Sequence, residues 1–162
     1  MDDQFTITWK AQEIADAFEV SLEEVRIYLT DGRKASFMVE RKIQRMHQGW
    51  QLAHSEGAGY DLIDPNGGLW EVRSITRNGV YFCSSRDVGS GRSFKEDLFY
   101  EKIDLVEGWI LADIECFPEV KVYKVDSGNV QKWYEDKLIG KTTSVSRKKF
   151  YSHLLGDIDN NV

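Results

Sequence analysis

The chain has 162 residues, of which 41% are hydrophobic and 12% aromatic, and its formal net charge is -6. This length supports one sizeable core rather than two, and the acidic balance excludes a protein that coats nucleic acid by bulk attraction alone. No apolar run approaches the roughly 20 residues of a membrane helix, and no secretion signal is recognisable at the start. We therefore expect a cytoplasmic protein with no membrane partner, and the widely separated Cys83 and Cys116 are expected to be core thiols.

Residues 10–30 have the 3.6-residue apolar rhythm of two short helices. Ser21 followed by Glu24 predicts a capping box at the start of the second helix. The stretch resembles a helix-turn-helix, although Glu19 stands where glycine usually makes the turn and the second helix begins with acidic residues that repel phosphates. We expect residues 1–34 to form a helical hairpin, which either reads DNA or packs on the core or on a second subunit.

A longer amphipathic helix is predicted for residues 35–55. Its expected buried positions are Val39, Ile43, Met46, Trp50 and Ala53. Glu40, His47 and His54 recur every seven residues along one flank, and this spacing of about 10 Å is too long for the two histidines to share a metal ion.

From residue 59 the pattern changes to strands. The segments GYDLID, LWEVRSIT and VYFCSS, separated by the turns PNGG and RNG, predict a three-stranded antiparallel meander. Residues 93–106 have a helical pattern, with Phe94, Leu98, Ile103 and Leu105 expected to point inward. Two buried strands, GWILADI and VKVYKV, then precede a helix near VQKWYEDKL and the basic segment SVSRKKFYSHLL.

This order predicts an α/β fold with a mixed central β-sheet that contains an antiparallel meander and is flanked by helices. We expect residues 35–162 to form this α/β core. The helical hairpin of residues 1–34 is expected to pack with the core as one compact domain.

Two carboxylates on neighbouring strands are the main candidates for chemistry. Asp61 and Glu71 are separated by nine residues that include the PNGG turn, so strand pairing would bring them side by side. Strand alternation places Glu71 and Arg73 on one face, with Trp70 and Val72 on the other. Hard cations such as Mg²⁺ prefer carboxylate oxygens. The pattern therefore predicts a divalent metal site; the alternative is an exposed hairpin whose acids merely keep its edge soluble.

The string GYDLIDPNGGLWEVRSIT resembles the PD-(D/E)xK, or restriction-endonuclease-like, nuclease superfamily. Those nucleases carry an aspartate on one strand, a Glu-x-Lys on the next and often a glutamate on the preceding helix. Asp61, Glu71 and Arg73 fall on the strand positions, and Glu40 falls on the helix. The resemblance follows the element order from about residue 36 to residue 115 and is sharp only in the stretch quoted.

The resemblance implies a restriction-endonuclease-like fold and a metal-dependent endonuclease, most typically a type II restriction enzyme. It would cut double-stranded DNA at a short palindrome as a homodimer. Asp61, Glu71 and Glu40 would hold Mg²⁺, and these three residues together with Arg73 would be the catalytic set. A nuclease acting on repair or recombination intermediates is the runner-up.

Arg73 departs from the lysine of the family. Arginine can hold a phosphate through two parallel hydrogen bonds but does not release a proton to activate water. Catalysis would then rest on the metal ion, or be slow, or be absent. The alternative function is therefore a catalytically silent nuclease-like module that binds DNA or protein. Asp64 is a second candidate for the metal-binding aspartate, but strand alternation places it on the opposite face from Asp61.

Two basic clusters are predicted to contact DNA. Arg86 and Arg92 belong to a glycine-rich loop that lacks the GK[ST] ending of a P-loop. Arg147, Lys148 and Lys149 lie in the basic segment near the C-terminus and could contact phosphates. For each cluster, solvated surface charge is the alternative interpretation.

Overall fold

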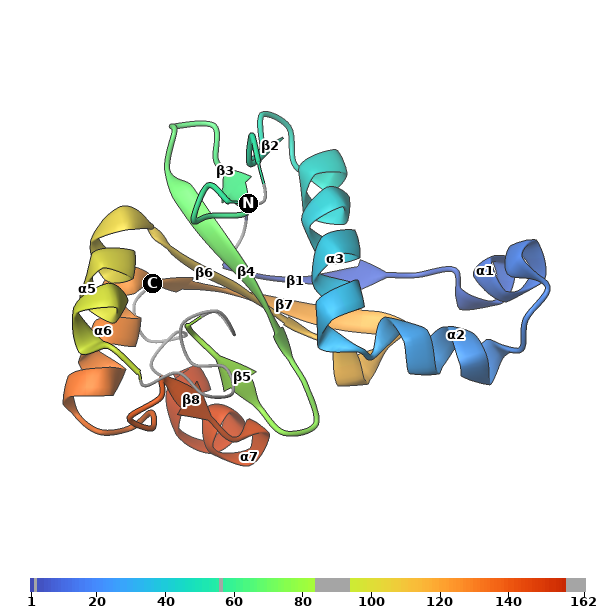
Figure 1. The fold of residues 1–162 in the computed structure, drawn as a ribbon. Coiled ribbons are helices and arrows are strands. Elements are labelled where there is room, and N and C mark those ends of the chain that lie inside the picture. Colours follow the sequence, from blue (N-terminus) through green and yellow to red (C-terminus); the bar gives the residue numbers. More distant parts are fainter. Residues whose placement is uncertain (2, 56, 84–93, 157–162) are drawn as a thin grey trace.

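The computed structural model describes residues 1, 3–55, 57–83 and 94–156. At the centre lies a curled mixed sheet of six strands flanked by helices (Figure 1). Across the sheet the strands follow the order β1 (Gln4–Thr8), β7 (Glu119–Asp126), β6 (Gly108–Asp113), β4 (Leu69–Ile75), β3 (Leu62–Ile63) and β2 (Gln51–Leu52). The predicted mixed α/β architecture is confirmed. Strand β1 was not predicted, and it extends the sheet by pairing with β7.

The pairing of β4 explains why the sheet is mixed. On one side β4 continues an antiparallel run from β2 and β3, and on the other it pairs in parallel with β6. Between β4 and β6 the chain includes helix α5 (Glu96–Leu105), and a crossover of this kind is what parallel neighbours require.

The predicted meander is wrong in its third strand. Strand β5 (Val80–Tyr81) pairs with β8 (Ser144–Val145) in a separate two-stranded sheet. Strand β6 pairs with the edge of β4 that β5 was expected to use. Of the predicted pairing between β4 and β5, the structure shows an isolated bridge between Thr76 and Gly79.

Each face of the sheet has its own apolar core, because side chains alternate along the strands. Ile110 and Ala112 of β6 belong to the core beneath α3 (Gly32–Met46). Trp109 and Leu111 belong to the core beneath α5 and α6 (Ser127–Glu135). Figure 1 shows α3 on one side of the strands and α5 with α6 on the other.

Helix α3 is shorter than the helix predicted for residues 35–55. It ends at Met46, and Gly49 then adopts a left-handed φ of 85° that turns the chain. Met46, expected to be buried, is 45% exposed, whereas Trp50 remains buried and its ring lies 6.2 Å from that of Trp70.

Helices α1 (Ala11–Phe18) and α2 (Leu22–Leu29) confirm the predicted pair and project sideways from the sheet (Figure 1). The capping box is formed: Ser21 Oγ accepts from the Glu24 amide, and the Glu24 carboxylate accepts from the Ser21 amide. Glu19 makes the turn with a left-handed φ of 55°. The predicted end of the hairpin segment at residue 34 falls within α3.

The C-terminal part packs against the α5 and α6 side of the sheet. It contains α7 (Arg147–Lys149) and the π-helical segment Phe150–Leu154, in which Phe150 and Leu154 are fully buried. The chain between β6 and β7 forms a 3-10 turn, Ile114–Cys116. Cys83 is buried and Cys116 is partly exposed. Within the described residues, no helix is both long and apolar enough to cross a bilayer.

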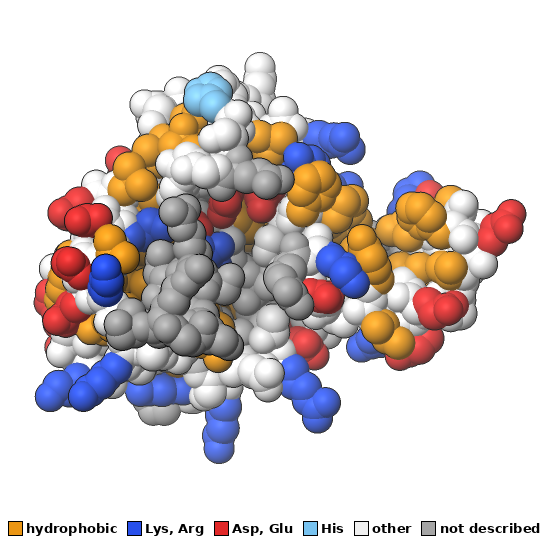
Figure 2. Space-filling model, viewed as in Figure 1, with side chains coloured by type: hydrophobic (Ala, Val, Ile, Leu, Met, Phe, Trp, Pro, Cys, Tyr) orange, Lys and Arg blue, Asp and Glu red, His pale blue; other side chains and the backbone are white. Residues whose placement is uncertain are grey.

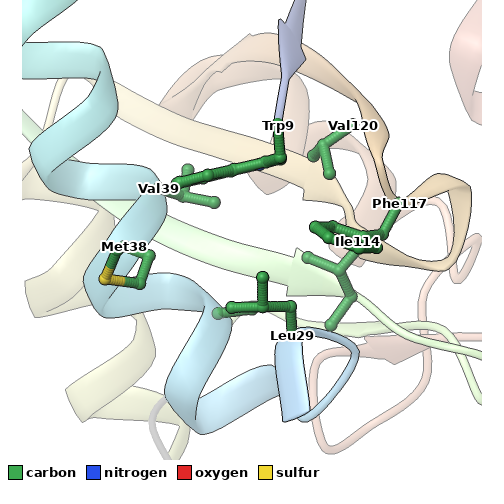
Figure 3. Close-up of a pocket in the computed structure, with 8 residues that line it drawn as sticks. Trp9, Leu29, Met38, Val39, Ile114, Phe117 and Val120 are labelled. Carbon is green, nitrogen blue, oxygen red and sulfur yellow. The ribbon is translucent and has the colours of Figure 1, made fainter. Parts of the chain in front are cut away.

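A small pocket opens between α2, α3 and the start of β7 (Figure 3). The residues that line it are Trp9, Leu29, Ala35, Met38, Val39, Ile114, Phe117 and Val120. Because this lining is apolar, the pocket offers no charged group to a phosphate or a metal ion.

Candidate functional site

Asp61 lies where β3 begins to pair with β4. Its backbone amide donates to the Trp70 carbonyl over 2.9 Å, as in a regular antiparallel pair. The next hydrogen bond to β4 is made by the Asp61 side chain, whose Oδ2 accepts from the backbone amide of Val72 over 2.7 Å. Asp61 is thus fixed against β4 by one carboxylate oxygen, which orients the other.

Glu71 is the most buried acid of the predicted site, with only 6% of its side chain exposed. It points away from Trp70 and Val72, which belong to the core beneath α3, as strand alternation predicts. Arg73, two residues along the same strand, pairs with Oε1, and Lys102 from α5 pairs with Oε2. Both carboxylate oxygens of Glu71 therefore have a cationic partner from the protein itself.

The surroundings of Glu71 disfavour its charged form. Burial raises the pKa of Glu71; the charge of Arg73 lowers it, the charge of Asp61 raises it and Lys102 lowers it, and the net result is a raised pKa. The two cations therefore only partly offset the cost of desolvation and of a second carboxylate nearby.

Glu40 approaches the same cluster from α3, with 18% of its side chain exposed. Its pKa is raised to about 7, first by burial and then by the charge of Asp61, against the lowering effect of Arg41. Glu71 contributes further repulsion. Glu40, Asp61 and Glu71 thus form an electrostatically coupled group. Figure 2 shows acidic and basic side chains gathered between the surfaces formed by α3 and α5.

The donor set has the chemistry that a hard divalent cation requires. Three coupled carboxylates offer the oxygen donors that Mg²⁺ prefers, and their mutual repulsion is what a cation would relieve. In the arrangement of the described side chains, however, no three His, Cys, Asp or Glu residues converge as a metal-binding group. The chemistry of the donors fits Mg²⁺, while the pairing of Glu71 with Arg73 and Lys102 means that a metal ion must displace a cation to reach it.

Asp64, the second candidate aspartate, organises the turn after β3. Oδ1 accepts from the amides of Asn66 and Gly68 at 2.8 and 2.9 Å, and Oδ2 accepts from the Trp70 indole at 3.1 Å. Burial alone would raise the pKa of Asp64, but these hydrogen bonds lower it overall. Asp64 is thus a turn-forming residue, and both of its carboxylate oxygens accept hydrogen bonds within the turn and from Trp70.

Lys102 is the site residue that sequence reasoning missed. Its ammonium group contacts both the Glu71 carboxylate and the Gly59 carbonyl, and 15% of its side chain is exposed. The helix was predicted with Leu98 and Leu105 pointing inward, but these are 38% and 45% exposed. Ile103 is buried as predicted, Phe99 is buried in place of Leu98, and this helical phase turns Lys102 toward β4.

A second buried acid, Asp113, lies at the end of β6. It is fully buried; Oδ1 accepts from Arg147, and Oδ2 accepts from the Tyr151 hydroxyl. The Cys116 thiol donates to the same Oδ2 over 3.4 Å. In the register of the parallel pair, Asp113 lies opposite Ile75, four residues beyond Glu71, or roughly 13 Å along the strand.

The predicted DNA-contact residues have different positions. Arg86 and Arg92 lie outside the described residues. Arg147 is engaged with Asp113, and only 28% of its side chain is exposed. Lys148 is exposed and Lys149 is partly buried on α7. A role for any of these residues in DNA binding stays a prediction.

Comparison with known proteins gives no relative: no family model matches the chain, and neither a curated protein nor a solved structure is detectably similar to it.

Proposed function

We propose that this protein is a Mg²⁺-dependent endodeoxyribonuclease whose site consists of Glu40, Asp61, Glu71 and Arg73. The observation that carries the proposal is the coupled carboxylate group itself: three acids from α3, the start of β3 and β4 repel one another in a largely buried position. Such an arrangement costs stability, and a bound cation is the usual compensation for it.

The order of elements supports the same proposal. Helix α3 precedes the antiparallel strands β2, β3 and β4, and α5 then leads to β6, which is parallel to β4. This succession shares the helix, the antiparallel hairpin, the second helix and the final strand with the order on which the resemblance to the PD-(D/E)xK nucleases rests, although β5 pairs with β8 rather than with the hairpin. Glu40 lies on α3, Asp61 directly precedes β3, and Glu71 with Arg73 lies on β4, which supports the proposal.

Each residue has a defined task in the proposed reaction. Glu40, Asp61 and Glu71 would hold the metal ion, which when bound polarises the scissile phosphate. Arg73 would clamp a phosphate oxygen, because its guanidinium group presents several donors in a fixed plane. Asp61 is pre-oriented by its bond to Val72, so its free oxygen needs little reorganisation to act as a ligand.

The wider proposal is a type II restriction enzyme that acts on double-stranded DNA at a short palindrome. One site per chain cuts one strand, so symmetric cleavage of a duplex calls for a homodimer. Discrete fragments from a long duplex would support this specificity, whereas cleavage only of branched or damaged DNA would support the repair alternative.

One observation favours a catalytically silent module as the second candidate. Both oxygens of Glu71 are paired within the protein, and Arg73 stands where the family has lysine. A silent protein would bind DNA without cutting it, with or without Mg²⁺. If Arg73→Lys restored cleavage to such a protein, the site would be a nuclease site that Arg73 keeps inactive.

The test compares Asp61→Asn with Asp64→Asn in Mg²⁺-dependent cleavage of plasmid DNA, with chelator as the blank. We expect Asp61→Asn to lower the rate on the order of 100-fold or more, because several kcal/mol of transition-state stabilisation depend on the metal. Asp64→Asn removes the same charge from a turn-forming residue and should retain most of the activity. Full activity of Asp61→Asn would refute the proposed site.

A further inference from the structure

Helix α5 holds the ammonium group of Lys102 beside Glu71 in the proposed metal site. Phe99 and Ile103 anchor the helix in the core, and this fixes the point from which Lys102 extends. From there its ammonium group reaches Glu71 and the Gly59 carbonyl. Lys102 thus has a second, neutral partner that does not depend on the state of Glu71.

The two cations at Glu71 are not equivalent. Arg73 lies two residues from Glu71 on the same strand face, and its Nη1 also donates to the Val72 carbonyl over 3.2 Å. It is therefore held beside Glu71 by the strand. Lys102 belongs to another element and extends on a flexible four-carbon stem. Of the two, Lys102 is the cation that can move away from Glu71 at the smaller structural cost.

We propose that Lys102 is an internal counter-ion that competes with the divalent metal for Oε2 of Glu71. With a metal ion held by Glu71, the ammonium group would keep the Gly59 carbonyl as its partner and release the carboxylate. Lys102 thereby acts as a positioning residue that neutralises Glu71 until the metal arrives. This inference rests on the proposed function.

The test measures magnesium binding to the free protein by isothermal titration calorimetry, without DNA. Lys102→Met removes the competing charge, and Lys95→Met is the control because Lys95 is exposed at the start of the same helix. We expect Lys102→Met to bind Mg²⁺ about three- to tenfold more tightly than the wild type, the scale of one partly screened ion pair. Lys95→Met should bind as the wild type does. Lys102→Gln, which keeps a donor for Gly59, serves if the methionine variant fails to fold.

Glu71→Gln separates the two ways in which the idea can fail. If Mg²⁺ binding is lost in Glu71→Gln but unchanged or weakened in Lys102→Met and Lys102→Gln, the counter-ion role is wrong and the metal site stands. If Mg²⁺ binds to none of these proteins, both the site and the counter-ion role are refuted. Binding that appears only after Lys102 is replaced would support the competition most directly.

Discussion

Glu71 and Asp113 are both buried carboxylates on the parallel strands β4 and β6, and both have an arginine partner. Around Asp113 the partners are all donors: Arg147, the Tyr151 hydroxyl and the Cys116 thiol. Around Glu71 the partners include two cations, but Asp61 and Glu40 add negative charge. The contrast teaches that burial and an ion pair do not themselves mark a functional acid. Repulsion among Glu71, Asp61 and Glu40 is what sets the proposed site apart from the Asp113 cluster.

The largest effect that we expect from this contrast concerns stability. Asp113→Asn should lower the free energy of unfolding by about 3–5 kcal/mol, because the partly buried Arg147 would lose the fully buried carboxylate with which it pairs. Urea denaturation measures this difference. The control, Asp126→Asn, makes the same change at an exposed position and should alter stability by about 0.5 kcal/mol or less. Equal effects of the two substitutions would mean that the contacts of Asp113 with Arg147, Tyr151 and Cys116 do not stabilise the fold.

An intermediate effect is expected from Glu40, and it depends on pH. Because the folded-state pKa of Glu40 is about 7 and its ordinary value is 4.5, the folded protein holds a proton between these values that the unfolded chain has released. The stability of the wild type should therefore fall as pH rises through this window. Glu40→Gln lacks this penalty and should be more stable than the wild type by on the order of 2 kcal/mol above pH 7, with little difference near pH 4.

The measurement is urea denaturation of both proteins from pH 4 to pH 8, in the presence of a chelator. A difference in stability that does not change with pH would contradict the repulsion assigned to Glu40. With Mg²⁺ added, the difference should shrink, because a bound cation offsets the same charges.

The smallest effect concerns one hydrogen bond at Asp113. Tyr151→Phe removes the hydroxyl that donates to Oδ2, while Arg147 and Cys116 remain. We expect a loss of about 1 kcal/mol in the free energy of unfolding, again measured in urea. A loss as large as that in Asp113→Asn would show that Tyr151, rather than the ion pair, is the main contribution.

Local patterns predicted much of the fold. The apolar rhythm placed α1, α2, α5, β6 and β7, and the Ser21 and Glu24 pair correctly marked the start of α2. Period-two alternation placed Glu71 and Arg73 on one face of β4, where they pair. These features depend on residues that are close in sequence, so they can be predicted from a single sequence.

What depends on distant residues was not predictable in the same way. The parallel partner of β4 is decided by the crossover through α5, not by the turn that follows β4. Arg147 and Tyr151, which both donate to Asp113, lie 34 and 38 residues further along the chain. Lys102 was missed because a shift of one residue in the assumed helical phase of α5 is enough to turn a side chain from solvent to the sheet.

The bond between the Asp61 carboxylate and the Val72 amide has a consequence for which acids position 61 accepts. One oxygen replaces a backbone carbonyl in the ladder of β4, so the distance from the main chain to the carboxylate is set by the spacing between strands. Glutamate has the same charge but one more methylene group, and it would push that oxygen past the amide. At this position the sheet selects an acid by its length as much as by its charge.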